Sequence, residues 1–355
     1  MKVFVAGGTG VIGRRAVRQL VERGHEVSAL VRSEAKAELV RSLGATPVEA
    51  SLFDADALRE AVAGHEVVIN LATHIPPVSK AASTSAWAEN DRIRTEGSAN
   101  LVDAALAAGA RRYIQESLAF LYDDHGDEWI DESEPLATTA FTDGVRVAEA
   151  AAQRFADNGG DRVVLRFGQF YAPEASHSLT ALKAARRGWM LIPGAPGNYL
   201  PSIAADDAAA SVVVAVDAPP GVYNIVDSDP VTREEWGQIM AAAVGRRRLH
   251  PMPRLFSRMA ARKAPNMVSS QRVSNRRFCE AAGWAPLHPS MREGVSLLTS
   301  GCARERRKMS HPGWLRRVPV AILAVSGLNL GVWIQAAPGR SSTSSRGSAI
   351  AGSAR

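Results

Sequence analysis

Three glycines near the start of the chain, Gly7, Gly10 and Gly13, have the spacing of a diphosphate-binding turn. They follow a short apolar run at Val3–Val5 and precede apolar residues that recur at helical spacing. The stretch therefore predicts a buried strand, a tight turn and a helix that begins near Val11. Glycines allow close backbone approach, and the free N–H groups at a helix start attract an anion. We interpret the stretch as a dinucleotide site rather than a bare strand–helix turn.

The residues after the second predicted strand, Glu26–Val31, indicate which dinucleotide binds. An acidic side chain there would bind the 2′-hydroxyl of NAD, whereas an arginine suits the 2′-phosphate of NADP. The chain has Arg32 and Ser33 at this point, and a guanidinium with a hydroxyl complements a phosphate dianion. Arg14, just inside the first predicted helix, is placed to add a second positive charge. NADP is therefore the expected cofactor, and NAD is less favoured.

Strands and helices alternate along the first part of the chain. Further strands are predicted at Thr46–Glu49, Glu66–Leu71, Tyr113–Gln115 and Val163–Arg166, and helices at Glu34–Leu43, Asp54–Val62, Ala86–Ala108 and Val145–Phe155. This alternation predicts an α/β fold of the Rossmann type, a doubly wound parallel sheet covered by helices on both faces. After about residue 170, shorter elements separated by Pro/Gly turns predict a smaller C-terminal substrate lobe.

The expected domain organisation has five parts. They are an NADP-binding Rossmann domain at 1–170, a substrate lobe at 171–300 interleaved with the sheet edge, a basic linker at 301–317, an apolar helix at 318–337 and a disordered tail at 338–355.

Composition excludes several kinds of protein. The 355 residues include two cysteines, which form no disulfide framework and indicate a reducing cytosol. The eight histidines show no paired spacing, so no metal site is expected. The net charge of +6 combines an acidic first part with a basic segment at 241–317. That segment lacks the interleaved aromatics and motifs of a nucleic-acid binder, and we interpret it as solvated helix faces.

The uncharged stretch 318–337 has two readings. It is long enough for a helix to span the about 30 Å core of a bilayer, and the preceding Arg316 and Arg317 would keep the enzyme side cytoplasmic. Pro319, Ser326 and Asn329 make insertion marginal, and the alternative is an apolar helix docked on the protein. The expected location is the cytoplasm, with a membrane contact through 318–337 under the first reading.

Several landmarks together resemble the short-chain dehydrogenase/reductase superfamily, in particular its extended NAD(P)-dependent epimerase/dehydratase branch and the atypical members of that branch. They are the run Gly7–Gly13, the segment Asn70–Thr73, the run Asn90–Leu101, the loop Leu165–Pro173 and the turn Gly283–Pro286. The resemblance implies a nicotinamide cofactor and a small carbonyl, alcohol or sugar-like substrate. It implies cofactor contacts from Gly7, Thr9, Gly10, Val11, Ile12, Gly13, Arg32, Ser33, Leu52, Leu71, Ala72 and Thr73.

The usual catalytic pair of such relatives is missing. In active relatives a Tyr-x-x-x-Lys pair exchanges a proton with the substrate, because the lysine lowers the pKa of the phenol. That register falls here on Phe141 and Val145, and no tyrosine in the chain has a lysine four residues later. The catalytic residues that we expect instead are Ser117 and Tyr122, with Glu116 a base if it is buried.

Two functions remain open from the sequence. One is an NADP(H)-dependent oxidoreductase or epimerase-like enzyme in which positioning does most of the work on a small-molecule substrate. The other is a non-catalytic NADP(H)-binding sensor. The full substrate lobe favours the enzyme, whereas Phe141 and Val145 favour the sensor.

Overall fold

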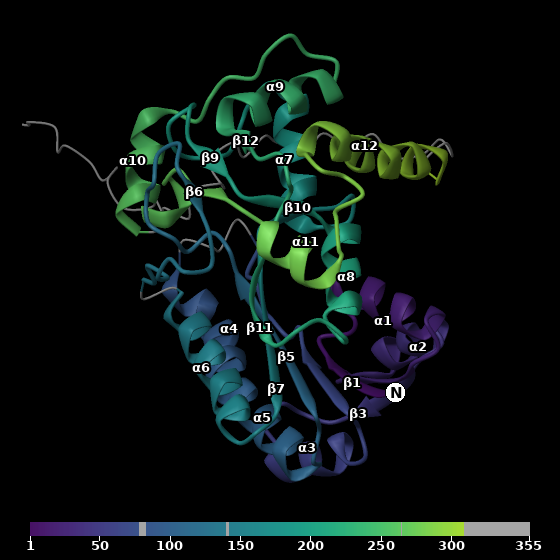
Figure 1. The fold of residues 1–355 in the computed structure, drawn as a ribbon. Coiled ribbons are helices and arrows are strands. Elements are labelled where there is room, and N and C mark those ends of the chain that lie inside the picture. The colour runs from purple at the N-terminus through teal and green to yellow at the C-terminus, as the bar shows by residue number, and fades with distance from the viewer. Residues whose placement is uncertain (78–82, 140–141, 264, 309–355) are drawn as a thin grey trace, which may run out of the picture.

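The computed structural model describes residues 1–77, 83–139, 142–263 and 265–308. Within these ranges a seven-stranded sheet forms the centre of the fold, with the order β11-β7-β5-β4-β1-β2-β3 (Figure 1). Its strands are β1 (Lys2–Ala6), β2 (Glu26–Val31), β3 (Thr46–Glu49), β4 (Val67–Asn70), β5 (Arg112–Leu118), β7 (Asp161–Phe167) and β11 (Gly221–Ile225). Every neighbouring pair is parallel. The predicted doubly wound α/β sheet is confirmed.

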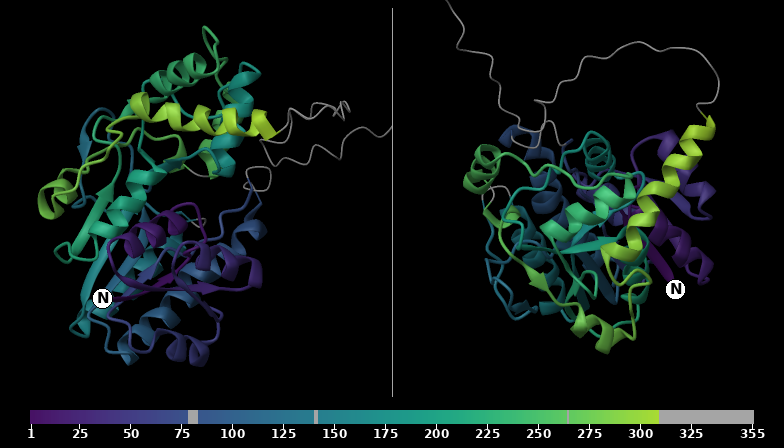
Figure 2. Two further views of the ribbon diagram at one scale, coloured as in Figure 1. Left: turned by 90° about the vertical axis from the view of Figure 1, so that its right-hand side faces the viewer. Right: turned by 90° about the horizontal axis from the view of Figure 1, so that it is seen from above.

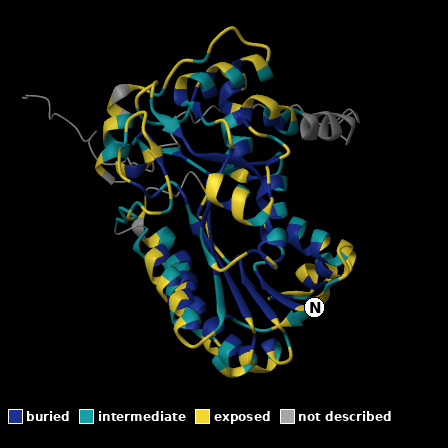
Figure 3. Cartoon of the chain, viewed as in Figure 1, coloured by how far each residue is buried: buried dark blue, intermediate teal, exposed yellow. Residues whose placement is uncertain are grey.

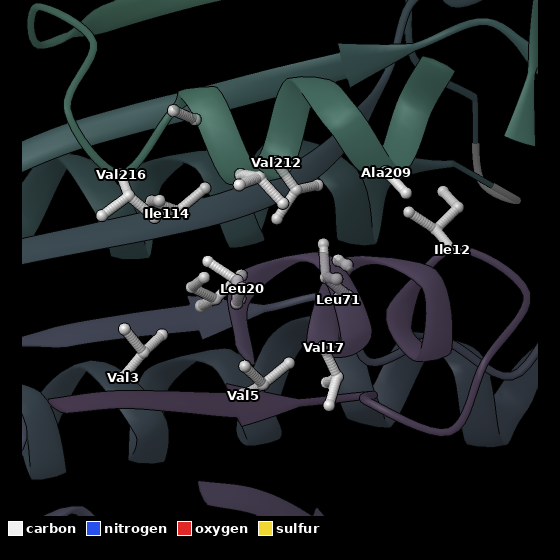
Figure 4. Packing of buried hydrophobic residues seen from close by; sticks show 14 of the residues in the cluster. Val3, Val5, Ile12, Val17, Leu20, Leu71, Ile114, Ala209, Val212 and Val216 are labelled. Atoms are coloured by element: carbon white, nitrogen blue, oxygen red, sulfur yellow. The ribbon is translucent and has the colours of Figure 1, made fainter. Parts of the chain in front are cut away.

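Helices cover both faces of the sheet, so its strands are buried (Figure 3). One face carries α1 (Gly13–Glu22), α2 (Glu34–Ser42) and α8 (Ala205–Val214), and the other carries α3 (Ala55–Val62), α5 (Ser98–Ala107) and α6 (Asp143–Asp157). On α1 the buried residues Ala16, Val17 and Leu20 recur at helical spacing. Figure 4 shows Ala209 and Val212 of α8 pointing toward α1 and Ile12. Each valine, leucine or isoleucine side chain among them contributes about 1.5–3 kcal/mol when it is fully buried.

A second layer of structure lies over the carboxyl-terminal edge of the sheet (Figures 1 and 2). Its helices are α7 (Ser176–Arg186), α9 (Arg233–Ala243), α10 (Arg254–Lys263), η3 (Pro265–Met267), α11 (Arg276–Ala282) and α12 (Met291–Lys308). Short strands pair β8 (Gln169–Tyr171) with β10 (Ser202–Ala204), β9 (Tyr199–Leu200) with β12 (Val231–Thr232), and β6 (Trp129–Ile130) with β13 (Arg272–Val273). This lobe has its own apolar core between α7, α9 and α12.

The segment 171–300 contributes both to the lobe and to the main sheet. The elements α8 and β11 belong to the segment 171–300 but join the main sheet and its helical layer. The single helix predicted at Ala86–Ala108 is divided into η1 (Thr84–Trp87), α4 (Ala88–Arg92), the π-helical turn η2 (Ile93–Gly97) and α5. A π-turn shifts the side chains on either side of it relative to a regular helix.

The C-terminal expectations need correction. Helix α12 continues to Lys308, so the first residues of the predicted linker at 301–317 are helical. The predicted apolar helix at 318–337 and tail at 338–355 lie outside the described residues. In the part of the chain that the structure describes, no helix combines the length and apolar content needed to cross a bilayer. On that finding, the predicted location, cytoplasmic with a membrane contact through 318–337, is corrected.

Candidate active site

The glycine turn connects the central strand β1 to α1 and has the close backbone packing of a phosphate cradle. Gly7 has a φ of +80°, and a Cβ on it would lie 2.5 Å from the carbonyl carbon and oxygen of Leu71. A Cβ on Gly13 would lie 2.1 Å from the oxygen of Gly7. Gly10 closes the turn by donating its N–H to the oxygen of Gly7 at 3.0 Å. Gly7 and Gly13 therefore accept only glycine, and the turn that they form leads directly into the N-terminus of α1.

The remaining cofactor contacts expected at the turn lie around this cradle. Ile12 is buried in the sheet core, and Val11 packs on a small apolar cluster beside the lobe. Leu71 and Ala72 follow β4, next to the turn, and the N–H of Ala72 donates to Oδ1 of Asn70 at 3.2 Å. Thr9 and Thr73 lie at the solvent side of the same edge. The structure thus brings the diphosphate contacts named from the sequence to one place, and their roles stay predictions.

The expected adenosine end of the site lies beyond β2. Arg32 is 67% exposed, and its Nη1 lies 3.5 Å from Oε1 of Glu89 on α4. Leu52 is buried beside this region, under the turn η2. The guanidinium of Arg92 stacks at 3.7 Å from the ring centroid of Phe53. Sequence reasoning did not find Glu89 or Arg92, because nothing in the local pattern places α4 beside the end of β2.

Arg14, which the sequence suggests as a second positive charge near the phosphate, lies beside an acidic side chain. Arg14 and Arg15 both form ion pairs with Glu174, from the loop after β8, and Nε of Arg15 lies 2.5 Å from Oδ1 of Asp206 on α8. These pairs tie the start of α1 to the substrate lobe. Ser33 precedes α2 in an extended conformation and makes no side-chain capping bond.

The predicted catalytic residues Ser117 and Tyr122 belong to one buried network. Ser117 Oγ donates to Oε1 of Glu149 at 2.5 Å, and Arg166 donates to both oxygens of Glu149 at 2.9 Å. Arg166 also donates to the Tyr122 hydroxyl at 2.9 Å, which in turn donates to Oδ1 of Asn224 at 2.8 Å. Burial raises the pKa of the Tyr122 phenol, and Arg166 opposes part of that rise. Both hydroxyls are therefore engaged inside the protein, and their catalytic roles stay predictions.

The register of the usual lysine holds an apolar residue. Val145 is 1% exposed in the first turn of α6, one helical turn before Glu149. Since residues four apart lie on one face of a helix, the Val145 side chain points toward the carboxyl end of β5. Phe141, in the register of the usual tyrosine, lies outside the described residues.

A second buried pair lies next to this network. Nη2 of Arg94 lies 2.9 Å from both oxygens of Glu116, and the two side chains are 2% and 6% exposed. Burial raises the pKa of the Glu116 carboxyl, and Arg94 lowers it by less. The sequence suggests Glu116 as a base on the condition that it is buried, and the structure shows that it is buried. The sequence did not identify its partner Arg94, which was named only within the run Asn90–Leu101. In the described ranges no group of three or more His, Cys, Asp or Glu side chains could hold a metal ion.

The parallel sheet, the glycine cradle and the lobe over the carboxyl edge define a dinucleotide-binding enzyme of the Rossmann class. The profile of a family described as NAD(P)H-binding matches residues 7–190. A 3-diazoavenalumate denitrifying reductase from a Streptomyces species is 33% identical over 312 residues, which are 83% of this chain and 99% of the relative. A 4-hydroxy-2-methyl-3-oxo-4-farnesyl-3,4-dihydroquinoline-1-oxide ketoreductase from Stigmatella aurantiaca is 31% identical over 243 residues, 65% of this chain and 70% of the relative.

Solved structures share this fold. The human epimerase family protein SDR39U1, solved with NADPH, has a TM-score of 0.71 at 25% identity and covers 84% of this chain and 99% of its own. A UDP-glucose 4-epimerase from Thermotoga maritima has a TM-score of 0.72 at 21% identity and covers 86% and 100%. The chain belongs to the NAD(P)H-binding family, within the extended short-chain dehydrogenase/reductase group. It is an NAD(P)-dependent enzyme of the oxidoreductase/epimerase type.

Proposed function

We propose that the chain is an NADP(H)-dependent reductase that passes hydride to a small organic acceptor without a proton from a tyrosine–lysine pair. When bound, the reduced nicotinamide supplies the hydride. The observation that carries the proposal is Val145, an apolar side chain 1% exposed at the carboxyl end of β5. A valine can neither hold a ribose hydroxyl nor lower the pKa of a phenol. Ser117 and Tyr122, the nearby hydroxyls, are bonded to Glu149 and Asn224.

The preference for NADP rests on Arg32. Its guanidinium is largely exposed at the end of β2, with Glu89 as a partner at 3.5 Å. A 2′-phosphate carries more negative charge than a carboxylate and would form the stronger charge-assisted hydrogen bonds with Arg32. The human relative solved with NADPH supports this preference, although other structural neighbours contain NAD.

An aromatic diazo compound is the acceptor that we favour. The denitrifying reductase from Streptomyces resembles this chain over 99% of its own length. Hydride added to the outer nitrogen of an aryl diazonium ion gives a neutral aryl diazene. The diazene releases N2 and leaves its hydrogen on the ring carbon, so one hydride enters and one N2 leaves. This hydride step needs no proton from a side chain, which fits a site that has Val145 where the usual lysine would stand.

A ketone is the second candidate, and the buried cation Arg94 favours it. Hydride transfer to a carbonyl carbon produces an alkoxide, which a nearby guanidinium stabilises until water supplies the proton. The quinoline-oxide ketoreductase supports this alternative at 31% identity.

The proposal is tested by mixing purified protein and NADPH with an aryl diazonium salt or with the matching aryl methyl ketone. We expect the absorbance of NADPH to fall only with an acceptor present, faster than with heat-inactivated protein, which measures the uncatalysed reaction. Tight NADPH binding without consumption by either acceptor would contradict the proposal and favour a sensor. Activity that appears only after the combined substitutions Phe141→Tyr and Val145→Lys would contradict it as well.

A further inference from the structure

Arg94 is a buried cation with unused hydrogen-bond donors. Its side chain is 2% exposed, and Nη2 binds Glu116 at 2.9 Å. Within the described residues, Nε and Nη1 of Arg94 have no hydrogen-bond partner. The buried Arg112 has one such donor, Nε, instead of two, because its Nη1 donates to the oxygens of Ala215 and Ala218 and its Nη2 binds Asp161. Leaving a buried donor unpaired costs about 1–3 kcal/mol, so two such donors on one guanidinium indicate a partner that binds there.

The position of Arg94 is where a substrate would lie. It belongs to the π-turn η2, and π-turns are frequent at functional sites. A Cβ on Gly144 would lie 3.4 Å from Cβ of Arg94, so the first turn of α6 packs directly on η2. Val145 follows Gly144, and Glu116 lies in the last part of β5. Arg94, Glu116 and Val145 therefore meet at the carboxyl edge of the sheet, where ligands bind in open α/β folds.

The distance from the glycine cradle agrees with this placement. Strand β5 pairs with β4, and β4 pairs with β1, which leads into the cradle. Two strand spacings are about 10 Å. A dinucleotide whose diphosphate lies at the cradle extends along this edge of the sheet, so its nicotinamide end and the acceptor lie on the side of β5.

We propose that Arg94 is a substrate-binding residue of the catalytic pocket whose Nε–H and Nη1–H hold an oxygen of the acceptor. This inference rests on the proposed reductase function. Glu116 fixes the guanidinium through Nη2 and leaves the other two donors for the ligand. Val145 beside it provides an apolar contact, so the pocket fits an acceptor with an aromatic or apolar body and an oxygen substituent, either carboxylate, phenolate or carbonyl. Nothing in the sequence pattern alone identified this residue.

The test compares acceptors with and without such an oxygen. The probes are an aryl acceptor of the class that the wild-type protein reduces, in a carboxylate form and in a methyl form. Charge-assisted hydrogen bonds contribute enough for a 10- to 100-fold effect. We expect Arg94→Met to raise KM for the carboxylate form by about that factor, to change KM for the methyl form by less than about twofold and to leave the Kd of NADPH unchanged. Arg94→Lys, which keeps the positive charge, should raise KM for the carboxylate form by a smaller factor.

Matched variants separate binding from folding. Arg94→Met with Glu116→Gln leaves no unpaired buried charge and should show the same selective loss. Arg112→Met removes a buried arginine at the opposite end of β5 and should change KM by the same factor for both acceptors. If the Arg94 variants raise KM equally for both acceptors, or raise the Kd of NADPH, the proposal is overturned.

A binding experiment distinguishes this inference from the proposed function. Benzoate and toluene are titrated into the complex of the protein with NADP⁺, which needs no turnover. We expect benzoate to bind more tightly to the wild type than to Arg94→Met, with little change for toluene, which has no oxygen. If the wild type oxidises no NADPH but shows this difference, the reductase proposal fails and the Arg94 site stands. If benzoate binds both proteins equally, the Arg94 site is wrong.

Discussion

The substitution Gly13→Ala should abolish dinucleotide binding without unfolding the protein. The added Cβ would lie 2.1 Å from the oxygen of Gly7, 2.9 Å from its carbonyl carbon and 2.9 Å from Cα of Gly8. These are backbone atoms, so no side chain can rotate away to relieve the contact. The start of α1 and the turn must separate by about 1 Å to restore an ordinary contact distance.

The magnitude follows from hydrogen-bond geometry. A shift of about 1 Å lengthens an N–H···O bond from about 2.9 Å to about 3.9 Å, beyond its useful range. Hydrogen bonds to a charged group contribute about 1.5–3 kcal/mol each, so losing two of them weakens binding by about 3–6 kcal/mol. That loss corresponds to a more than 100-fold increase in the Kd of NADPH.

The assay is a fluorescence titration of NADPH, with circular dichroism to verify folding. Gly10→Ala is a graded control, because its Cβ would meet the oxygen of Gly7 at 3.3 Å and should cost less than about tenfold. Gly24→Ala is a second control. Gly24 has a φ of +81° with open space around it, so the variant should lose about 1 kcal/mol of stability and no affinity. A folded Gly13→Ala protein that binds NADPH as tightly as the wild type would refute the phosphate cradle.

Four further predictions concern charges elsewhere in the site and core. Arg32→Ala should raise the Kd of NADPH at least about tenfold and leave that of NADH unchanged, measured by the same titration. Glu89→Gln should lower the Kd of NADPH about threefold at low ionic strength, because a carboxylate 3.5 Å from Arg32 repels the 2′-phosphate; an equal change for NADH would contradict this. Glu149→Gln should reduce the free energy of unfolding in urea by about 3 kcal/mol, because Arg166 loses its buried partner; a change below about 1 kcal/mol would contradict it. Burial raises the pKa of the Asp227 carboxyl well above its ordinary 3.8, and the nearby charges of Asp207 and Glu293 raise that pKa further. Hydrogen bonds that Ser202 and Tyr171 donate to Asp227 oppose part of the rise. The folded state thus keeps a proton that the unfolded chain releases, so stability falls as pH rises above about 4, and Asp227→Asn should flatten that dependence in urea titrations at several pH values.

Local sequence patterns were sufficient for the sheet and the cofactor turn. A strand, a tight turn and a helix are encoded within the first residues by an apolar run, three glycines and helical spacing. The next strands follow from apolar runs such as the one at β4, which the structure places beside β1 in the sheet. Parallel pairing then brings the carboxyl ends of these strands to one edge, which is why Leu71 lies against Gly7.

The catalytic end depends on contacts between distant parts of the chain. Ser117 binds Glu149 on a helix that begins well after its strand, and Arg166 joins both to Tyr122. The periodicity of nearby residues in the sequence does not predict such a network. The interruption of the long helix at η2 was not predicted either: Ile93, Thr95 and Gly97 are weak helix formers, but helix propensity does not distinguish a π-turn from a regular turn. Arg94 owes its burial to that turn and to Glu116.

The apolar stretch 318–337 shows the limit of reading one segment by composition. Its uncharged run favoured a membrane helix and a docked helix equally, because length and hydropathy do not determine the partner of an apolar surface. The structure does not describe those residues, and among the helices that it does describe none could cross a bilayer.

The most direct measurement is a single-turnover reaction in which the protein–NADPH complex is mixed with an aryl diazonium ion while NADPH oxidation and N2 release are recorded together. We predict one N2 released for each NADPH oxidised, a slower reaction when the transferred hydrogen of NADPH is deuterium, and no dependence on a restored tyrosine or lysine. A bound NADPH that stays reduced through the whole reaction, or N2 released without NADPH oxidation, would contradict hydride transfer at this site.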